Sequence, residues 1–139
     1  MIVVALIALA AGVVSLALRD PSSMRLESEA QRLITLLESA RAESRVSGVA
    51  VSWVPARADE QPPFRFVQGS GTQSKTMERP THWLDPQVRA EVVDAPAVQL
   101  GPEPLIGAQR IVLRLADQRL LVGTDGLGPF AVVAEEARP

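Results

Sequence analysis

The sequence predicts an α+β protein in which a long N-terminal helix, first apolar and then amphipathic, leads into an antiparallel β head. Three observations carry this prediction. The first 18 residues contain no charged side chain, residues 23–47 repeat apolar residues at intervals of three and four, and the rest consists of short β-prone runs between prolines and glycines. We therefore divide the 139 residues into a transmembrane helix at 1–18, an amphipathic helix at 19–48 and an antiparallel β head at 49–139.

Residues 1–18 form an apolar run long enough to enter a membrane. As a helix the run would span roughly 27 Å, close to the thickness of the hydrocarbon core of a bilayer. Backbone polar groups in lipid must bond within the segment, so an uncharged run of this length is stable there as a helix. Ala8 with Gly12, and Ala11 with Ser15, place small residues four apart, which predicts close packing on another helix; a plain anchor with incidental small residues is the alternative.

A cleaved secretory signal is the rival interpretation of this run. Ser15, Leu16 and Ala17 loosely resemble a small-residue cleavage site. No basic residue precedes the apolar stretch, however, whereas a signal peptide begins with a basic region. We therefore favour an uncleaved anchor.

The amphipathic helix is expected from Ser23 to Ser47, with Gly48 as its C-terminal cap. Pro21 lacks an amide hydrogen, so it either kinks one continuous helix or starts a second one, and we favour the kinked helix, roughly 70 Å long. Charged residues, including Glu29, Arg32 and Arg41, are expected on the wet side. The residues predicted to pack the helix on the head are Leu26, Ala30, Leu33, Leu37 and Ala40.

After Gly48 the hydrophobic period changes to that of strands. We expect a hairpin turn at 116–118 and a surface loop at 69–74. The connections are too short for crossover helices, so the strands should pair antiparallel. The candidate strands are Val49–Val54, Phe64–Val67, Arg89–Val93, Ala97–Leu100, Arg110–Leu115, Arg119–Gly123 and Pro129–Ala134.

The strand at 110–115 has the clearest alternation of apolar and basic residues. Ile111, Leu113 and Leu115 are predicted to point to one face, and Arg110, Val112 and Arg114 to the other. Such a strand is half buried, which is typical of an antiparallel sheet with one wet face.

Composition argues against nucleic acid and against cysteine chemistry. The 14 basic and 16 acidic residues are interspersed and give a net charge of -2, without the basic block that phosphate neutralisation requires. The chain contains no cysteine, so it can form neither a disulfide nor a thiolate nucleophile.

Catalytic and ligand-binding motifs are equally sparse. His82 is the single histidine, no serine lies in a G-x-S-x-G turn, and no cluster of ligand residues accompanies the histidine, so we expect a structural or surface role for it. Trp53 is expected in the core, and core packing is also favoured for Trp83 over contact with a partner. We predict no enzyme activity, cofactor, metal or small-molecule substrate.

The order of an apolar helix, an amphipathic helix and an antiparallel head resembles the type IV pilin family. Residues 1–7 resemble the segment that follows the processing motif of such proteins, a glycine, a phenylalanine and a nearby glutamate. That motif is absent here, so we infer that the natural start lies upstream of Met1 or that the chain was trimmed. The cleavage and N-methylation expected for the family therefore map onto no residue of the given sequence. Within the family, residues 29–48, 100–113 and 125–130 are similar to the H-type minor pseudopilins of type II secretion systems.

This resemblance implies a structural subunit near the tip of a periplasmic pseudopilus that exports folded proteins across the outer membrane. The chain would cross the bacterial inner membrane once, with its C-terminal head in the periplasm. Its partners would be the major pseudopilin, other minor pseudopilins and the prepilin peptidase. A minor pilin of a type IV pilus, acting in pilus assembly or DNA uptake, is the first alternative, although the tail at 134–139 carries two acids against one base. A signal-anchored periplasmic binding module is the second.

Overall fold

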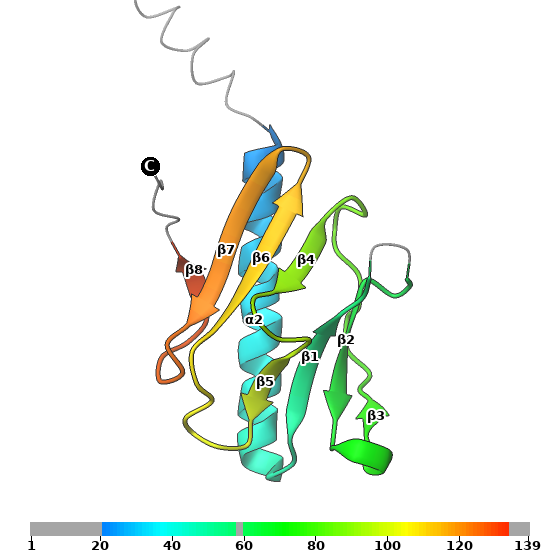
Figure 1. Cartoon of the computed structure of the whole chain (residues 1–139), viewed down its shortest axis with the longest axis vertical. Helices are drawn as coiled ribbons and strands as arrows, with labels where there is room; N and C mark the ends of the chain where they lie inside the picture. Colours follow the sequence, from blue (N-terminus) through cyan, green and yellow to red (C-terminus); the bar gives the residue numbers. More distant parts are fainter. Residues whose placement is uncertain (1–20, 58–59, 134–139) are drawn as a thin grey trace, which may run out of the picture.

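The computed structural model describes residues 21–57 and 60–133, so the predicted membrane helix at 1–18 lies outside the described residues. One long helix, α2 (Pro21–Ser47), comes first, and antiparallel strands and a short turn of 3-10 helix, η1 (Gly71–Gln73), follow it (Figure 1). The predicted α+β class with antiparallel pairing is confirmed. The strands are β1 (Val51–Pro55), β2 (Phe64–Gln68), β3 (Lys75–Thr76), β4 (Arg89–Val92), β5 (Val98–Gly101), β6 (Gln109–Leu115), β7 (Gln118–Thr124) and β8 (Ala131–Val133).

Helix α2 packs one face on the strands from Leu26 to Ser44. It begins at Pro21, two residues before the predicted start, because proline is tolerated in the first helical turn. The predicted kink at Pro21 concerns a junction that is outside the described residues. At the other end Gly48 has a φ of 72° and donates its amide to the Ser44 carbonyl at 2.9 Å, the predicted glycine cap. The residues assigned to helix-to-head packing are at most 2% exposed: Leu26, Ala30, Leu33, Leu37 and Ala40.

The strands form two antiparallel sheets of four, and α2 lies behind both of them in Figure 1. Sheet A has the order β3-β2-β1-β5, and sheet B has the order β4-β6-β7-β8. Strands β6 and β7 form the longest hairpin, in which Leu115 pairs with Gln118. The turn is therefore Ala116-Asp117, one residue shorter than predicted, and Ala116 adopts a φ of 55°.

A glutamine side chain joins the two sheets. The Gln109 amide accepts a hydrogen bond from the Gln99 backbone N–H at 2.7 Å and donates one to the Gln99 carbonyl at 2.8 Å. These are the two bonds that a neighbouring strand residue would make. The side chain thus replaces a backbone partner where edge strand β5 meets the start of β6.

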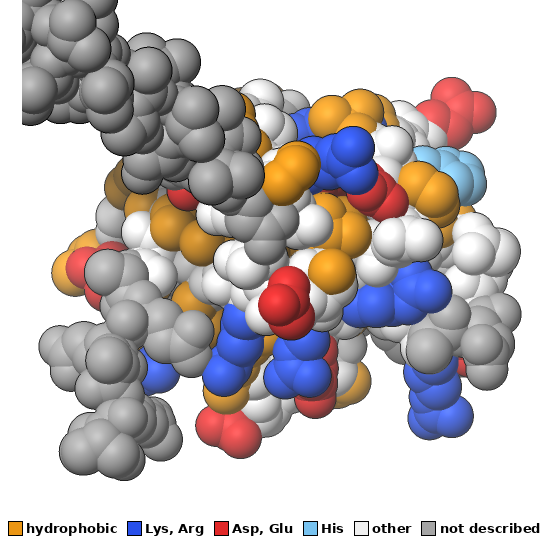
Figure 2. Space-filling view, turned by 90° about the horizontal axis from the view of Figure 1, so that it is seen from above, with side chains coloured by type: hydrophobic (Ala, Val, Ile, Leu, Met, Phe, Trp, Pro, Cys, Tyr) orange, Lys and Arg blue, Asp and Glu red, His pale blue; other side chains and the backbone are white. Residues whose placement is uncertain are grey.

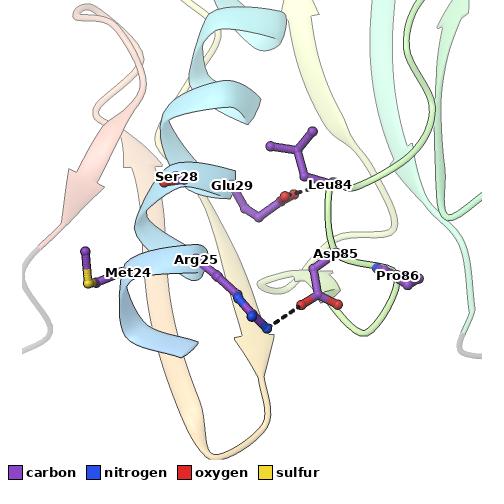
Figure 3. A pocket seen from close by; sticks show the side chains of 7 residues that line it. All are labelled: Met24, Arg25, Ser28, Glu29, Leu84, Asp85 and Pro86. Carbon is purple, nitrogen blue, oxygen red and sulfur yellow. Dashed lines mark hydrogen bonds and ion pairs between the residues drawn. The ribbon is translucent and has the colours of Figure 1, made fainter. Parts of the chain in front are cut away.

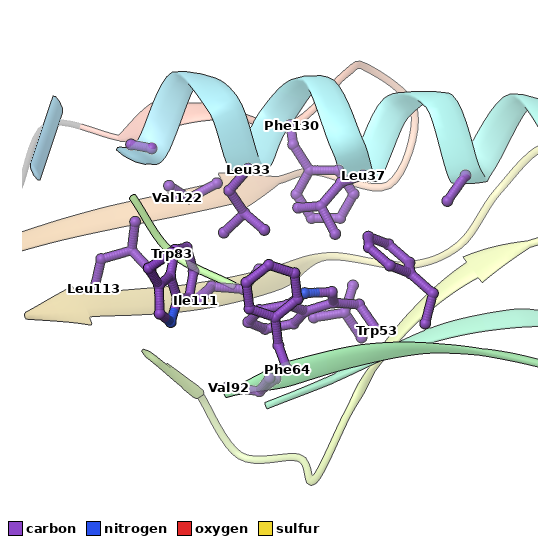
Figure 4. Packing of buried hydrophobic residues seen from close by; sticks show 14 of the residues in the cluster. Leu33, Leu37, Trp53, Phe64, Trp83, Val92, Ile111, Leu113, Val122 and Phe130 are labelled. Carbon is purple, nitrogen blue, oxygen red and sulfur yellow. The ribbon is translucent and has the colours of Figure 1, made fainter. Parts of the chain in front are cut away.

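The core lies between α2 and the two sheets. Figure 4 shows Leu33 and Leu37 projecting from the helix towards Phe130 and the aromatic side chains below it. Trp53 and Phe64 have ring centroids 5.7 Å apart and are tilted relative to each other, within the separation at which aromatic side chains attract one another. Trp53 is fully buried, as predicted. One helix therefore shares a single core with both sheets.

Three sequence expectations for the strands need correction. Strand β3 was not predicted; it directly follows the expected loop at 69–74, which contains η1, and it pairs with the end of β2. Val112 points away from the core face yet is only 4% exposed, because it lies between residues of β1, of β4 and of the loop after β4. The last strand is limited to Ala131–Val133 in the part described.

A membrane-spanning helix is not found among residues 21–57 and 60–133: no helix there is both long and apolar enough. Helix α2 has the length but carries charged residues on several faces. The prediction of a transmembrane segment at 1–18 is thus not addressed by the described part of the chain.

Candidate functional site

The clearest pocket beside α2 lies at the end of the molecule where this helix begins (Figure 3). It has a volume of about 490 Å³ and is formed between the first two turns of the helix and the loop that precedes β4. Its lining residues are Met24, Arg25, Ser28, Glu29, Leu84, Asp85 and Pro86.

Glu29 is the most unusual residue of this pocket, because it is a carboxylate with only 2% exposure. Its Oε1 accepts a hydrogen bond from the Leu84 amide at 2.8 Å, whereas its Oε2 is buried without a partner. Burial raises the pKa of the Glu29 carboxyl, and the backbone amides of Leu84 and Asp85 and the charge of Arg32 oppose this rise in part. The carboxylate therefore ties the helix to the loop at an electrostatic cost.

The rim of the pocket combines an ion pair with apolar side chains. Arg25 and Asp85 are 3.6 Å apart, and the arginine side chain is 66% exposed, so this pair adds little stability. Met24 and Leu84 are 53% and 69% exposed. Figure 2, which looks onto this end, shows apolar side chains gathered beside an adjacent acidic and basic pair. An apolar rim around a carboxylate suits contact with the side chains of another protein.

The loop behind the pocket is fixed from both sides. Arg32 donates a hydrogen bond to the His82 carbonyl at 2.7 Å, so the helix holds the loop at a second point. Trp83 is 7% exposed and packs on Phe64, with ring centroids 4.7 Å apart. Trp83 is thus a core residue, as predicted. His82 is exposed, and its Nδ1 lies 3.1 Å from the Thr81 hydroxyl.

A second buried polar tie lies towards the other end of α2. Arg41 is 3% exposed and donates hydrogen bonds to the carbonyls of Gly128 at 2.8 Å, Gly126 at 3.2 Å and Pro104 at 3.4 Å. Glu38, one turn earlier, accepts the Phe130 amide at 3.2 Å. The helix therefore holds the closing loops of the chain as well as the loop before β4.

The placement of Glu29 and Arg41 corrects the sequence analysis, which put both on the wet side. The helical spacing contained the signal, because Glu29 follows Leu26 by three residues and Arg41 follows Leu37 by four. Such positions border the buried row. Their burial depended on loops that could not be placed from the sequence.

The remaining predicted site residues have different outcomes. Those assigned to helix packing in the membrane or filament lie outside the described residues: Ala8, Ala11, Gly12 and Ser15. Within residues 21–57 and 60–133, no group of three or more His, Cys, Asp or Glu side chains is placed to hold a metal ion.

Comparison with known proteins adds no assignment. No family model, curated protein or solved structure matches the chain.

Proposed function

We propose that the chain is a filament subunit of the type IV pilin kind, a minor pseudopilin of a type II secretion system. The observation that carries this proposal is the relation between α2 and the apolar run. Helix α2 starts at Pro21, three residues after the run ends at Leu18, and extends for 27 residues, about 40 Å, along the head. A rod fixed to a head and continued by an apolar segment is what such a subunit requires.

The attachment of the helix supports a mechanical role. Buried residues occur from Leu26 to Ser44, so nearly every turn of α2 contributes to the core. Glu29 and Arg41 add polar ties near its two ends. A force on the helix is therefore transmitted to both sheets, as it must be in a subunit that pushes or carries a load.

In this proposal residues 1–18 lie in the inner membrane before assembly and in the filament core afterwards. An apolar helix can exchange lipid for like helices because both satisfy its surface, and Ala8, Ala11, Gly12 and Ser15 allow close approach. The head remains in the periplasm, where it contacts the major pseudopilin and other minor pseudopilins. The prepilin peptidase would process the chain.

Cysteine cross-linking tests the proposal, because the natural chain has no cysteine to interfere. Gly12→Cys and the loop variant Ser74→Cys would be expressed together with a major pseudopilin that carries one cysteine in its apolar helix. We expect an intermolecular disulfide with Gly12→Cys only, and a chain that stays in the membrane fraction after an alkaline wash. Recovery of a freely soluble periplasmic protein that begins after Ala17 would exclude the filament role and favour the binding module.

A further inference from the structure

A second cleft opens on the opposite side of sheet B from α2. It has a volume of about 570 Å³, within the range of roughly 300–1,000 Å³ that is typical of ligand pockets. Three segments form it: the end of β1 and the residues after it, strand β4 with the following loop, and the middle of β6. None of the interactions described above for α2 involves this cleft.

The direction of the cleft follows from the register of β6. Ile111, Leu113 and Leu115 lie in the core beneath α2, so Val112 and Arg114, at the alternate positions, point to the outer face. Val112 is nevertheless 4% exposed. Pro55 also lines the cleft, so its floor is apolar although it lies on the wet side of the sheet.

Arginines surround this apolar floor. Arg57, Arg89 and Arg114 line the cleft together with a single carboxylate, Glu91, so the lining residues carry three positive charges and one negative charge. The whole chain, in contrast, has a net charge of -2. The cleft is thus a local basic surface on a weakly acidic protein.

The arginines are also paired unfavourably within the sheet. Arg89 lies directly opposite Arg114, and Arg114 lies directly opposite Arg119. Like charges at directly opposed positions destabilise a sheet. None of the ion pairs found among the described residues neutralises Arg57, Arg89 or Arg114. Opposed arginines of this kind lower the stability of the sheet. A bound anionic ligand would relieve this repulsion, so their presence supports a role in binding.

The chemistry of the lining arginines suits a carboxylate ligand. Nη1 of Arg89 donates hydrogen bonds to the carbonyls of Pro86 at 3.0 Å and Val88 at 3.1 Å, which restrict the side chain. A planar guanidinium binds a carboxylate through two parallel hydrogen bonds. The apolar floor would accept an aliphatic side chain next to that carboxylate.

We propose that this cleft binds an acidic segment of a protein partner, with carboxylates on Arg89 and Arg114 and an aliphatic side chain over Val112. Nucleic acid fits the cleft less well, because no aromatic side chain lines it for base stacking. The proposal goes beyond the filament role. If that role holds, α2 faces the filament axis and the cleft faces outward, towards proteins outside the filament.

The test uses the full chain in detergent micelles and a fluorescein-labelled peptide of alternating glutamate and leucine. Binding is followed by fluorescence anisotropy at low and at physiological salt. Arg114→Gln is the diagnostic variant, and Arg110→Gln is its matched control, because Arg110 lies on the same strand and the same face but does not line the cleft. We expect Arg114→Gln to weaken binding about tenfold and Arg110→Gln to change it less than about twofold.

Folding is monitored separately for both variants. Because Arg114→Gln removes the like charge opposite Arg89, its melting temperature should be equal to or above that of the natural chain. Equal losses of affinity in the two variants, or equal binding of a glutamine-leucine peptide, would overturn the proposal. Tighter binding of a single-stranded oligonucleotide than of the acidic peptide, lost in Arg114→Gln, would also overturn it and assign the cleft to nucleic acid. Neither result depends on the cross-linking outcome, so the two proposals fail independently.

Discussion

Replacement of Arg41 by methionine probes the tie between α2 and the closing loops. Methionine keeps the length and the apolar stem of the side chain but removes the charged donor from the carbonyls of Gly126 and Gly128. These carbonyls then keep only the Ile106 amide at 3.4 Å and the Thr124 hydroxyl at 2.8 Å, respectively. Hydrogen bonds to a charged group contribute about 1.5–3 kcal/mol each, and the third contact, to Pro104 at 3.4 Å, is too long to count fully. Since burial of the charge is itself unfavourable, we take the lower end for two bonds and expect a loss of about 3–4 kcal/mol.

The measurement is urea unfolding of the full chain in micelles, followed by the far-ultraviolet signal of α2. In a thermal scan of the same samples, a loss of this size should lower the melting temperature by about 13–17 °C for a head of roughly 110 residues. Arg45→Met is the control, because Arg45 is exposed one turn later and should cost about 0.5 kcal/mol or less. If the two variants unfold within about 0.5 kcal/mol of each other, the buried tie contributes nothing and the reasoning is refuted.

Further predictions concern the hydrogen bond between Glu29 and Leu84 and the backbone conformation at two turns. Because the pKa of Glu29 is raised in the folded chain, the stabilisation that comes from protonation of this carboxyl is complete below the ordinary pKa of 4.5 and is lost as the pH rises through the raised pKa. Urea unfolding across this pH range should show that loss in the natural chain and not in Glu29→Gln. Gly126→Ala should cost about 3 kcal/mol or more, because residue 126 has a φ of 96° and a new Cβ would lie 2.7 Å from the Gly107 carbonyl carbon. Gly107→Ala should cost about 1–2 kcal/mol, because residue 107 has a φ of 79° but open space around a new Cβ. Similar urea midpoints for the two variants would contradict this. Ala116→Gly should stabilise the chain by about 0.5 kcal/mol or more, because residue 116 adopts a φ of 55°, and a lower melting temperature would show that the turn is not strained.

The helix and the strand positions could be read largely from the sequence because both depend on local periodicity. Leu26, Leu33 and Leu37 repeat with the helical period, and Ile111 and Leu113 alternate with the strand period. These spacings identify an element and its buried face without knowledge of any neighbour. The cap at Gly48 was predictable for the same reason.

The polar ties and the basic cleft depend on contacts between residues far apart in the chain. The pairing of Glu29 with Leu84 spans 55 residues, and that of Arg41 with Gly128 spans 87. Likewise, Val112 is nearly buried because it lies at the bottom of a cleft whose other walls come from distant segments, and the alternation within its own strand does not predict these segments. Arg89 and Arg114 lie opposite each other only because of the register in which β4 pairs with β6, and the hydrophobic pattern of the sequence does not determine that register.

The buried ties explain how α2 can hold one position along the head. A row of leucines and alanines at intervals of three and four would bury similar area if the helix slid by one turn, since the row nearly repeats itself. Such a slide would leave Glu29 and Arg41 buried without their backbone partners, at a cost of several kcal/mol. We infer that the two residues define the register of the helix in addition to stabilising its attachment. In a filament subunit, that register fixes the distance between the apolar run and the arginine cleft, so an error of one turn, about 5.4 Å, would displace every head contact along the axis.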